Sequence, residues 1–173
     1  VPVAIDGSGK SKGYKFLSFA NIYILNYEGV KAELEIIKLL LETQKFIIVL
    51  DESQRIKNPD SQTFEAINRI KKLSVRRYIL TCTPVANNAQ DLWAQFYLID
   101  DGKTLGKDFN TFKKDYKTSG ISKDKLIELR SKIQSISIRR LKDNVLELPE
   151  KIFQTILVEL SPEQNKIYKK LKK

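Results

Sequence analysis

Short hydrophobic runs recur along the chain, separated by segments that are richer in polar residues. Four of these runs are too short for buried helices and predict β-strands at residues 1–5, 20–25, 46–50 and 77–81. The run at 46–50 reads Phe-Ile-Ile-Val-Leu, with no alternating polar residue. A strand of this composition is typical of a parallel sheet that is buried on both faces.

Hydrophobic residues between and after these runs recur at helical spacing. The spacing predicts helices over residues 30–44, 61–70 and 89–99. Short polar residues that can cap the second and third of these helices stand just before them: Asp60 or Ser61, and Asn87 or Asn88. The alternation of strands and helices predicts an α/β fold in which helices flank a parallel sheet.

After residue 100 the chain becomes rich in lysine and keeps helical spacing. We therefore predict a helical insertion or protrusion over residues 101–137, next to the α/β region of residues 1–100. Residues 152–160 alternate well enough to predict one further strand. Ser161 is a good N-cap for a following helix, because a proline takes the first helical position and a glutamine follows three residues past the cap.

The composition is that of a basic domain with a sizeable core. The chain has 173 residues, of which 42% are hydrophobic, and a net charge of +10. Residues 101–173 hold 18 Lys and Arg against 10 Asp and Glu, so +8 of the charge lies there. Such a balance favours polyanionic partners such as nucleic acid, with a generally basic protein as the alternative.

Several kinds of site are excluded by residue usage. With one cysteine, Cys82, and no histidine, the chain cannot form an internal disulfide, a zinc site or a Ser-His-Asp triad. No hydrophobic run is long enough to span a membrane and no signal peptide heads the chain, so we expect an intracellular protein without a membrane partner, in a bacterial or phage-infected cytoplasm or in a nucleus. Because the chain starts at Val1 and lacks methionine, we expect a fragment or a processed product.

Two acidic residues follow the third strand directly. Ligands of parallel α/β sheets bind beyond the carboxyl ends of the strands, and Asp51 and Glu52 stand at such an end. One acid can hold Mg²⁺, directly or through water, while the other orients the water that attacks a γ-phosphate. This is the Walker B pattern, and the alternative is a strand that ends in a solvated acidic turn.

A second phosphate-binding candidate lies near the start of the chain. Residues 4–11 match a relaxed phosphate-loop pattern that ends in Gly9-Lys10-Ser11. Such a loop needs a helix that begins at the Lys-Ser pair, so that backbone N–H groups surround the phosphate. Gly13 and the absence of hydrophobic periodicity argue against that helix and favour a flexible basic turn, although a small nucleotide-binding protein that uses this loop stays open.

Residues 51–58, Asp-Glu-Ser-Gln-Arg-Ile-Lys-Asn, resemble motif II of the Swi/Snf-type ATPases, the DNA-translocating branch of the superfamily two helicases. Residues 80–88, with Asp91-Leu92-Trp93, resemble motif III of that family. Further segments match in the same order along nearly the whole chain: Asn26-Tyr27-Glu28, residues 138–142, residues 148–151, and residues 160–164 with Tyr168. The resemblance implies a partial RecA-like lobe one over residues 1–100, the helical protrusion over 101–137, and over 138–173 the end of the lobe with a linker toward a second lobe.

Members of this family bind ATP and Mg²⁺ between two RecA-like lobes and hold double-stranded DNA across both. This chain lacks an upstream loop of the family's Gly-Lys-Thr type and the whole second lobe. The resemblance therefore implies a fragment of an ATP-dependent DNA translocase that is inactive in isolation. The alternative is a degenerate lobe that binds DNA or protein without catalysis.

The resemblance also assigns roles in the nucleotide site. Asp51 would hold Mg²⁺ through water and Glu52 would polarise the attacking water, with Gln54 beside them in the nucleotide cleft. Ser53 and Gln54 stand where the family usually has Ala and His, and Cys82 replaces a glycine.

Further residues would connect this site to DNA. Hydroxyl hydrogen bonds from Thr81 and Thr83 would link the cleft to DNA contacts, unless these threonines simply cap a strand. Polar residues expected to contact the DNA backbone or the neighbouring lobe, or alternatively to brace the local structure, are Lys57, Asn58, Asn87, Asn88, Arg139 and Arg140.

Overall fold

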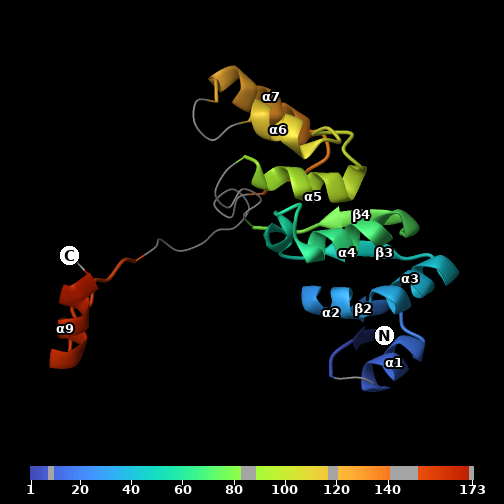
Figure 1. The fold of residues 1–173 in the computed structure, drawn as a ribbon, viewed down its shortest axis with the longest axis horizontal. Helices are drawn as coiled ribbons and strands as arrows, with labels where there is room; N and C mark the ends of the chain where they lie inside the picture. Colours follow the sequence, from blue (N-terminus) through green and yellow to red (C-terminus); the bar gives the residue numbers. More distant parts are fainter. Residues whose placement is uncertain (8–9, 83–88, 117–120, 141–151, 172–173) are drawn as a thin grey trace. The chain divides into compact units, whose positions relative to one another are not determined.

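The chain folds into two units, residues 1–137 and residues 138–173. A computed structural model describes residues 1–7, 10–82, 89–116, 121–140 and 152–171 (Figure 1).

Two pairs of parallel strands organise the first unit. In the first pair Val3 lies opposite Tyr23, and in the second pair Val49 lies opposite Tyr78. The described residues thus form two two-stranded sheets. All four predicted strands are present, each shorter than the hydrophobic run that predicts it: β1 (Pro2–Ala4), β2 (Ile22–Ile24), β3 (Ile47–Leu50) and β4 (Arg76–Ile79).

Helices connect the strands within each pair and between the pairs. The connecting elements are α1 (Lys10–Leu17), α2 (Tyr27–Ala32), α3 (Leu34–Thr43), the 3-10 helix η1 (Ser53–Ile56), α4 (Gln62–Ile70) and the 3-10 helix η2 (Lys71–Leu73). Ile5, Phe16, Ile37, Leu41 and Ile70 form a core against which residues from both strand pairs pack. Side-chain packing therefore joins the two pairs where the described strands share no hydrogen bonds.

Three of these elements differ from the sequence prediction: α1 was not expected, and α2 and α3 take the place of one helix over 30–44. A helix begins at Lys10, where a flexible turn was favoured, so the prediction was wrong there. The expected helix over 30–44 begins earlier, at Tyr27, because the Asn26 side chain accepts a hydrogen bond from Gly29 N at 2.6 Å and caps it. A Cβ at Gly29 would approach Asn26 Oδ1 to 2.7 Å, so a larger residue there would force the capping side chain to shift.

Helix α5 (Asp91–Asp100) is the central helix of the first unit. Figure 1 shows it between the β3–β4 pair and the helices α6 (Phe109–Asp115) and α7 (Lys123–Gln134). Six consecutive residues from Asp91 to Phe96 are buried, because neighbours cover more than one side of the helix. Its N-cap is Gln90, which makes no side-chain capping hydrogen bond; Asn87 and Asn88, the expected caps, lie outside the described residues.

Aromatic residues hold α6 against α5. Trp93 stacks on Tyr97 with ring centroids 4.7 Å apart and also contacts the Phe109 ring. Its indole N–H donates to the Gly106 carbonyl at 3.1 Å. Helices α6 and α7 thus share the core of residues 1–100, while their role as a protrusion from a lobe remains a prediction.

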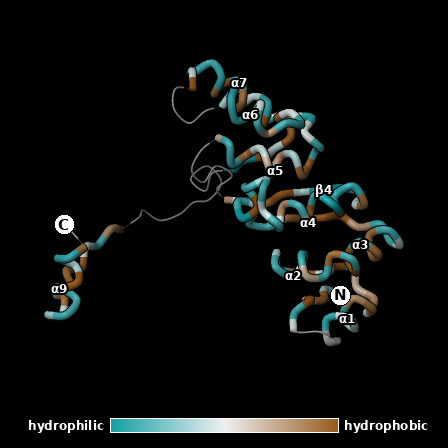
Figure 2. The backbone as a smooth tube through the Cα atoms, in the orientation of Figure 1, coloured by the Kyte–Doolittle hydropathy of each residue, from teal (hydrophilic) through white to brown (hydrophobic). Residues whose placement is uncertain are grey.

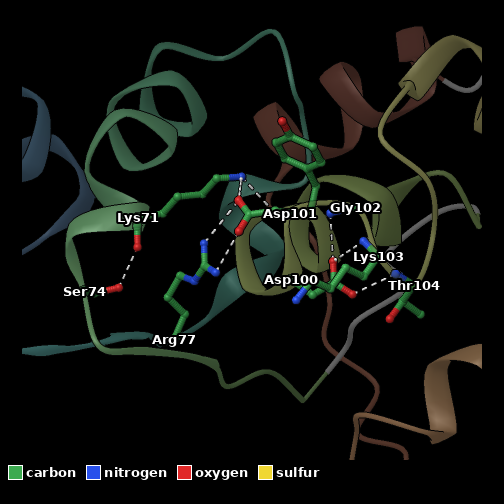
Figure 3. A network of polar contacts seen from close by, with 9 residues as sticks. Lys71, Ser74, Arg77, Asp100, Asp101, Gly102, Lys103 and Thr104 are labelled. Carbon is green, nitrogen blue, oxygen red and sulfur yellow. Dashed lines mark hydrogen bonds and ion pairs between the residues drawn. The ribbon is translucent and has the colours of Figure 1, made fainter.

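A polar network ties the C-terminal end of α5 to η2 and β4 (Figure 3). Lys71, only 2% exposed, donates to the Tyr97 carbonyl at 3.0 Å and pairs with the Asp101 carboxylate at 2.9 Å. Arg77 donates to the same carboxylate at 2.9 and 3.3 Å. The hydrogen bond that Arg77 donates to Asp101 is the main reason that the pKa of Asp101 falls to about 2.

One face of the strands is uncovered in the first unit. Ile47 and Val49 of β3 are each 53% exposed, and alternate residues of β2 and β4, Ile22, Ile24 and Tyr78, are exposed as well. The expectation that the 46–50 strand is buried on both faces is therefore wrong here. The described helices cover one side of β3, which buries Leu50 in the core and leaves the alternate side chains in solvent.

The second unit contains one described helix, α9 (Pro162–Leu171). Its start is the predicted capping box: Ser161 Oγ accepts from Gln164 N at 3.3 Å, and Gln164 Oε1 accepts from Ser161 N at 3.0 Å. Figure 2 shows both hydrophobic and hydrophilic residues along α9, and none of its residues is buried. The strand expected at 152–160 is absent, because the described residues supply no strand to pair with it.

None of the helices in the described part of the chain combines the length and hydrophobicity that crossing a membrane requires.

Candidate functional site

The candidate site lies where β3 and β4 end side by side. Asp51 and Glu52 follow β3, and Thr81 comes two residues after the end of β4. Since the strands are parallel, both carboxyl ends lie at the same edge. The pairing continues past the strands, with Leu80 N donating to Leu50 O at 2.9 Å and Ser53 N donating to Leu80 O at 3.1 Å.

Asp51 is exposed at this edge and held by short contacts. Its Oδ1 accepts from the Glu52 backbone N at 2.9 Å, and its carbonyl accepts from the Tyr27 hydroxyl at 2.6 Å. Desolvation is the main reason that the pKa of Tyr27 rises to about 12, with the nearby carboxylates adding to the effect and Arg55 opposing it. Tyr27 thus keeps its proton and donates to the backbone of the strand end.

Glu52 adopts a left-handed backbone conformation, with φ 48° and ψ 49°. A non-glycine residue in this region is uncommon and is found disproportionately at functional sites. The conformation turns the chain sharply out of β3 and into η1. Ser53 to Ile56, which the sequence predicted as part of a polar loop, form this 3-10 turn.

A chain of side-chain hydrogen bonds joins the acid to the end of β4. Gln54 Nε2 donates to Glu52 Oε2 at 2.7 Å, and Gln54 Oε1 accepts from Thr81 Oγ1 at 2.7 Å. A glutamine amide has a donor and an acceptor at its end, so it can occupy the middle of such a chain. The structure therefore brings together Glu52, Gln54 and Thr81, three of the residues that the sequence singled out.

The turn formed by η1 is supported by side chains of α2 and of α5. Arg55 pairs with Glu28 at 3.1 Å, and its guanidinium lies 5.6 Å from the centroid of the Tyr27 ring. Residues 27–28 thus support the turn from α2.

Two further bracing residues, Gln95 and Asp91, come from α5 and were missed by the sequence prediction. Ser53 Oγ donates to Gln95 Oε1 at 2.6 Å, and Lys57 Nζ lies 3.4 Å from Asp91 Oδ2. The signal that could have found Gln95 is a polar residue within a strongly hydrophobic helix, because such a residue needs a buried partner.

The residues present fit a site for Mg²⁺ that also uses phosphate oxygens. Among the described residues, no group of three or more Asp, Glu, Cys or His side chains is arranged to hold a metal ion. Mg²⁺ commonly binds through one or two carboxylates together with waters and substrate phosphates. Asp51 can supply one such carboxylate, because its second oxygen accepts no hydrogen bond from the described residues.

The remaining predicted residues are distributed more widely. Lys57 is half-buried in its ion pair with Asp91, which agrees with a bracing role for this lysine. Asn58 Oδ1 accepts from Asp60 N at 2.9 Å and closes a local turn. Arg139 and Arg140 are exposed and belong to the second unit, so they are not placed relative to the site. Thr83, Asn87 and Asn88 lie outside the described residues.

Comparison with known families decides the assignment. The SNF2-related domain matches residues 3–173. The chain belongs to this family. The resemblance of residues 51–58 and 80–88 to Swi/Snf-type motifs is therefore confirmed as a family relationship.

The similar proteins are much longer than this chain. An uncharacterized ATP-dependent helicase, MG018, of Mycoplasma genitalium is 32% identical over 174 residues, which cover 98% of this chain and 16% of the helicase. The DNA repair and recombination protein RAD54-like of Danio rerio is 30% identical over 193 residues, covering 97% of this chain and 25% of that protein. The chain thus spans at most a quarter of either relative.

A solved structure confirms the fold class. The Sulfolobus solfataricus SWI2/SNF2 ATPase core in complex with dsDNA matches with a TM-score of 0.66 at 28% identity, over 98% of this chain and 35% of that chain. The α/β fold is that of a partial SNF2 RecA-like lobe.

Proposed function

We propose that this chain is part of the first lobe of an ATPase that uses ATP hydrolysis to move along double-stranded DNA. The observation that carries the proposal is the hydrogen-bonded chain Glu52–Gln54–Thr81 at the adjoining ends of two parallel strands. It connects the acid that follows one strand to a hydroxyl that follows the next. Family membership supports the same function.

Each residue of the site has a role in this proposal. Bound Mg·ATP supplies the phosphoryl group and the charge-neutralising cation. Asp51 would hold the Mg²⁺ through water, and Glu52 would polarise the attacking water. Gln54 keeps the Glu52 carboxylate in place and, through Thr81, makes its position sensitive to the segment that follows β4.

Duplex DNA is the proposed partner, contacted through phosphates rather than bases. The net charge of +10 favours such contacts, and Asn58, Thr83, Asn87, Asn88, Arg139 and Arg140 remain the candidates. The solved relative bound to dsDNA supports this choice. The second RecA-like lobe and the upstream phosphate loop would come from the complete protein.

The test is DNA-stimulated ATP hydrolysis by the complete protein that carries this chain. We expect Glu52→Gln to abolish turnover while nucleotide binding persists. Thr81→Val removes the hydroxyl at nearly constant volume, and we expect it to lower kcat about fivefold, since a hydrogen bond contributes roughly 1 kcal/mol.

The other outcomes point to other functions. Hydrolysis by the isolated chain that is lost in Lys10→Ala would indicate a site at Gly9-Lys10-Ser11, whose Lys10 begins helix α1. No hydrolysis by the complete protein, with DNA or protein binding retained, would indicate a degenerate binding lobe. Either result would reject the proposed function.

A further inference from the structure

A buried polar pair, Ser53 and Gln95, connects the turn after Glu52 to the central helix α5. Both residues are 0% exposed. Ser53 Oγ lies 2.6 Å from Gln95 Oε1, although 42 residues separate them along the chain. Since water cannot reach this position, neither side chain can exchange its partner for solvent.

The direction of the hydrogen bond between them is fixed by the helix. Gln95 Nε2 donates to the Asp91 carbonyl oxygen at 2.8 Å. A carbonyl oxygen can only accept, so the amide NH₂ faces Asp91 and Oε1 faces Ser53. The Ser53 hydroxyl is therefore the donor, and the orientation of the Gln95 amide is set by its own helix.

The Ser53–Gln95 pair is connected to Glu52, the residue that precedes Ser53. Ser53 is the first residue of η1, and the left-handed Glu52 connects it to β3. Its backbone N–H is anchored to Leu80 O, and its hydroxyl is anchored to Gln95. The next side chain, Gln54, bonds instead to Glu52 and Thr81. Ser53 is thus held in place at the start of the turn, and the neighbouring Gln54 holds the Glu52 carboxylate.

We propose that Gln95 is a positioning residue for ATP hydrolysis, which acts through Ser53 on the placement of Glu52. The inference rests on the function proposed above and adds to it a residue that does not touch the nucleotide. If either partner is removed, the turn shifts to satisfy the polar group that remains. A displacement of about 1 Å at a reacting group can lower the rate about 100-fold.

The test compares Gln95→Met, Ser53→Ala and the double variant in the complete protein. Methionine keeps the unbranched shape of glutamine without its amide. We expect each single change to lower the kcat of DNA-stimulated hydrolysis about 10- to 100-fold with little change in KM. We expect the double variant to recover to within about fivefold of the parent protein, because neither partner of the Ser53–Gln95 hydrogen bond is then left without the other.

Affinity for a non-hydrolysable ATP analogue shows that each variant is folded, and we expect it within about threefold of the parent. Leu98→Met is the matched control on the same helix: it changes a side chain of equal depth, 1% exposed, that has no hydrogen-bonding group. We expect its kcat to equal that of the parent. If Gln95→Met fails to fold, Ser53→Ala and its recovery in the double variant decide the question.

Two results would overturn the inference while hydrolysis still depends on Glu52. One is a kcat within about twofold of the parent in the single variants that fold. The other is a loss that the double variant does not recover. An activity that Glu52→Gln leaves intact would reject both the inference and the proposed function, so the two failures are distinguishable.

Discussion

Ser53 and Gln54 show how two substitutions in one motif are accommodated. They occupy positions where the family usually has Ala and His. Ser53 brings a buried hydroxyl that needs an acceptor and finds it in Gln95. Gln54 brings an amide that donates to Glu52 and accepts from Thr81. Each new polar group is therefore satisfied by a specific partner, which agrees with a functional motif.

Asp101 is the residue whose titration should be visible in stability. Its pKa is about 2 in the folded chain and 3.8 in the reference state, chiefly because Arg77 donates to it. A lowered pKa contributes stability in full above the unfolded value, so this contribution is lost as the pH falls through 3.8 toward 2. We expect Asp101→Asn to flatten the fall in unfolding free energy between about pH 5 and pH 2.

Urea denaturation of the chain at a series of pH values measures this effect. If unfolding free energy falls with pH equally in the parent chain and in Asp101→Asn, the lowered pKa of Asp101 is not the source of the fall.

At the scale of the element, α4 illustrates a helix whose start is set locally and whose position is set by packing. Ser61 Oγ accepts from Phe64 N at 3.2 Å and caps the helix. Phe64, Ile67 and Ile70 are buried on its inner face. The sequence predicted this inner face and a cap at Asp60 or Ser61, because an N-cap and an amphipathic pattern depend on neighbours within one or two turns.

We expect Ser61→Ala to lower the free energy of unfolding by about 1 kcal/mol, because an N–H at the start of α4 loses its acceptor. Equilibrium denaturation with unchanged m-value is the measurement. Ser61→Asp retains an acceptor and should stay close to the parent chain. If Ser61→Ala and Ser61→Asp lower the free energy of unfolding equally, loss of the cap is not the cause of the lower stability.

At the scale of the molecule, the uncovered strand face is the main departure from a self-contained domain. Parallel sheets are normally covered on both sides, and here Ile47 and Val49 face solvent. Exposed apolar surface of this kind promotes association.

We expect the isolated chain to associate with increasing concentration, and the double variant Ile47→Thr/Val49→Thr to remain monomeric at about tenfold higher concentration. Sedimentation velocity over a concentration series measures this shift. Ile127→Thr is the control, since Ile127 is 66% exposed but lies on α7, away from the strands. Association that Ile127→Thr reduces equally would argue against a role for the strand face.

The sequence by itself determined the four strands, a helix cap at Asp60 or Ser61, the cap at Ser161, and the position of Asp51 and Glu52 at a strand end. These features depend on residues close together in the chain. It failed for residues 152–160, whose alternating pattern is not enough to form a strand without a partner.

Tertiary structure alone decided which features became a site. The hydrogen bond from Ser53 to Gln95 and the hydrogen bond from Thr81 to Gln54 join segments that are distant in sequence, and they hold the turn that begins at the left-handed Glu52. Burial of Lys71 and exposure of Val49 likewise depend on which elements cover them. Local patterns state which residues favour a helix or a strand; which buried polar groups meet, and which faces stay in water, is decided when the chain packs.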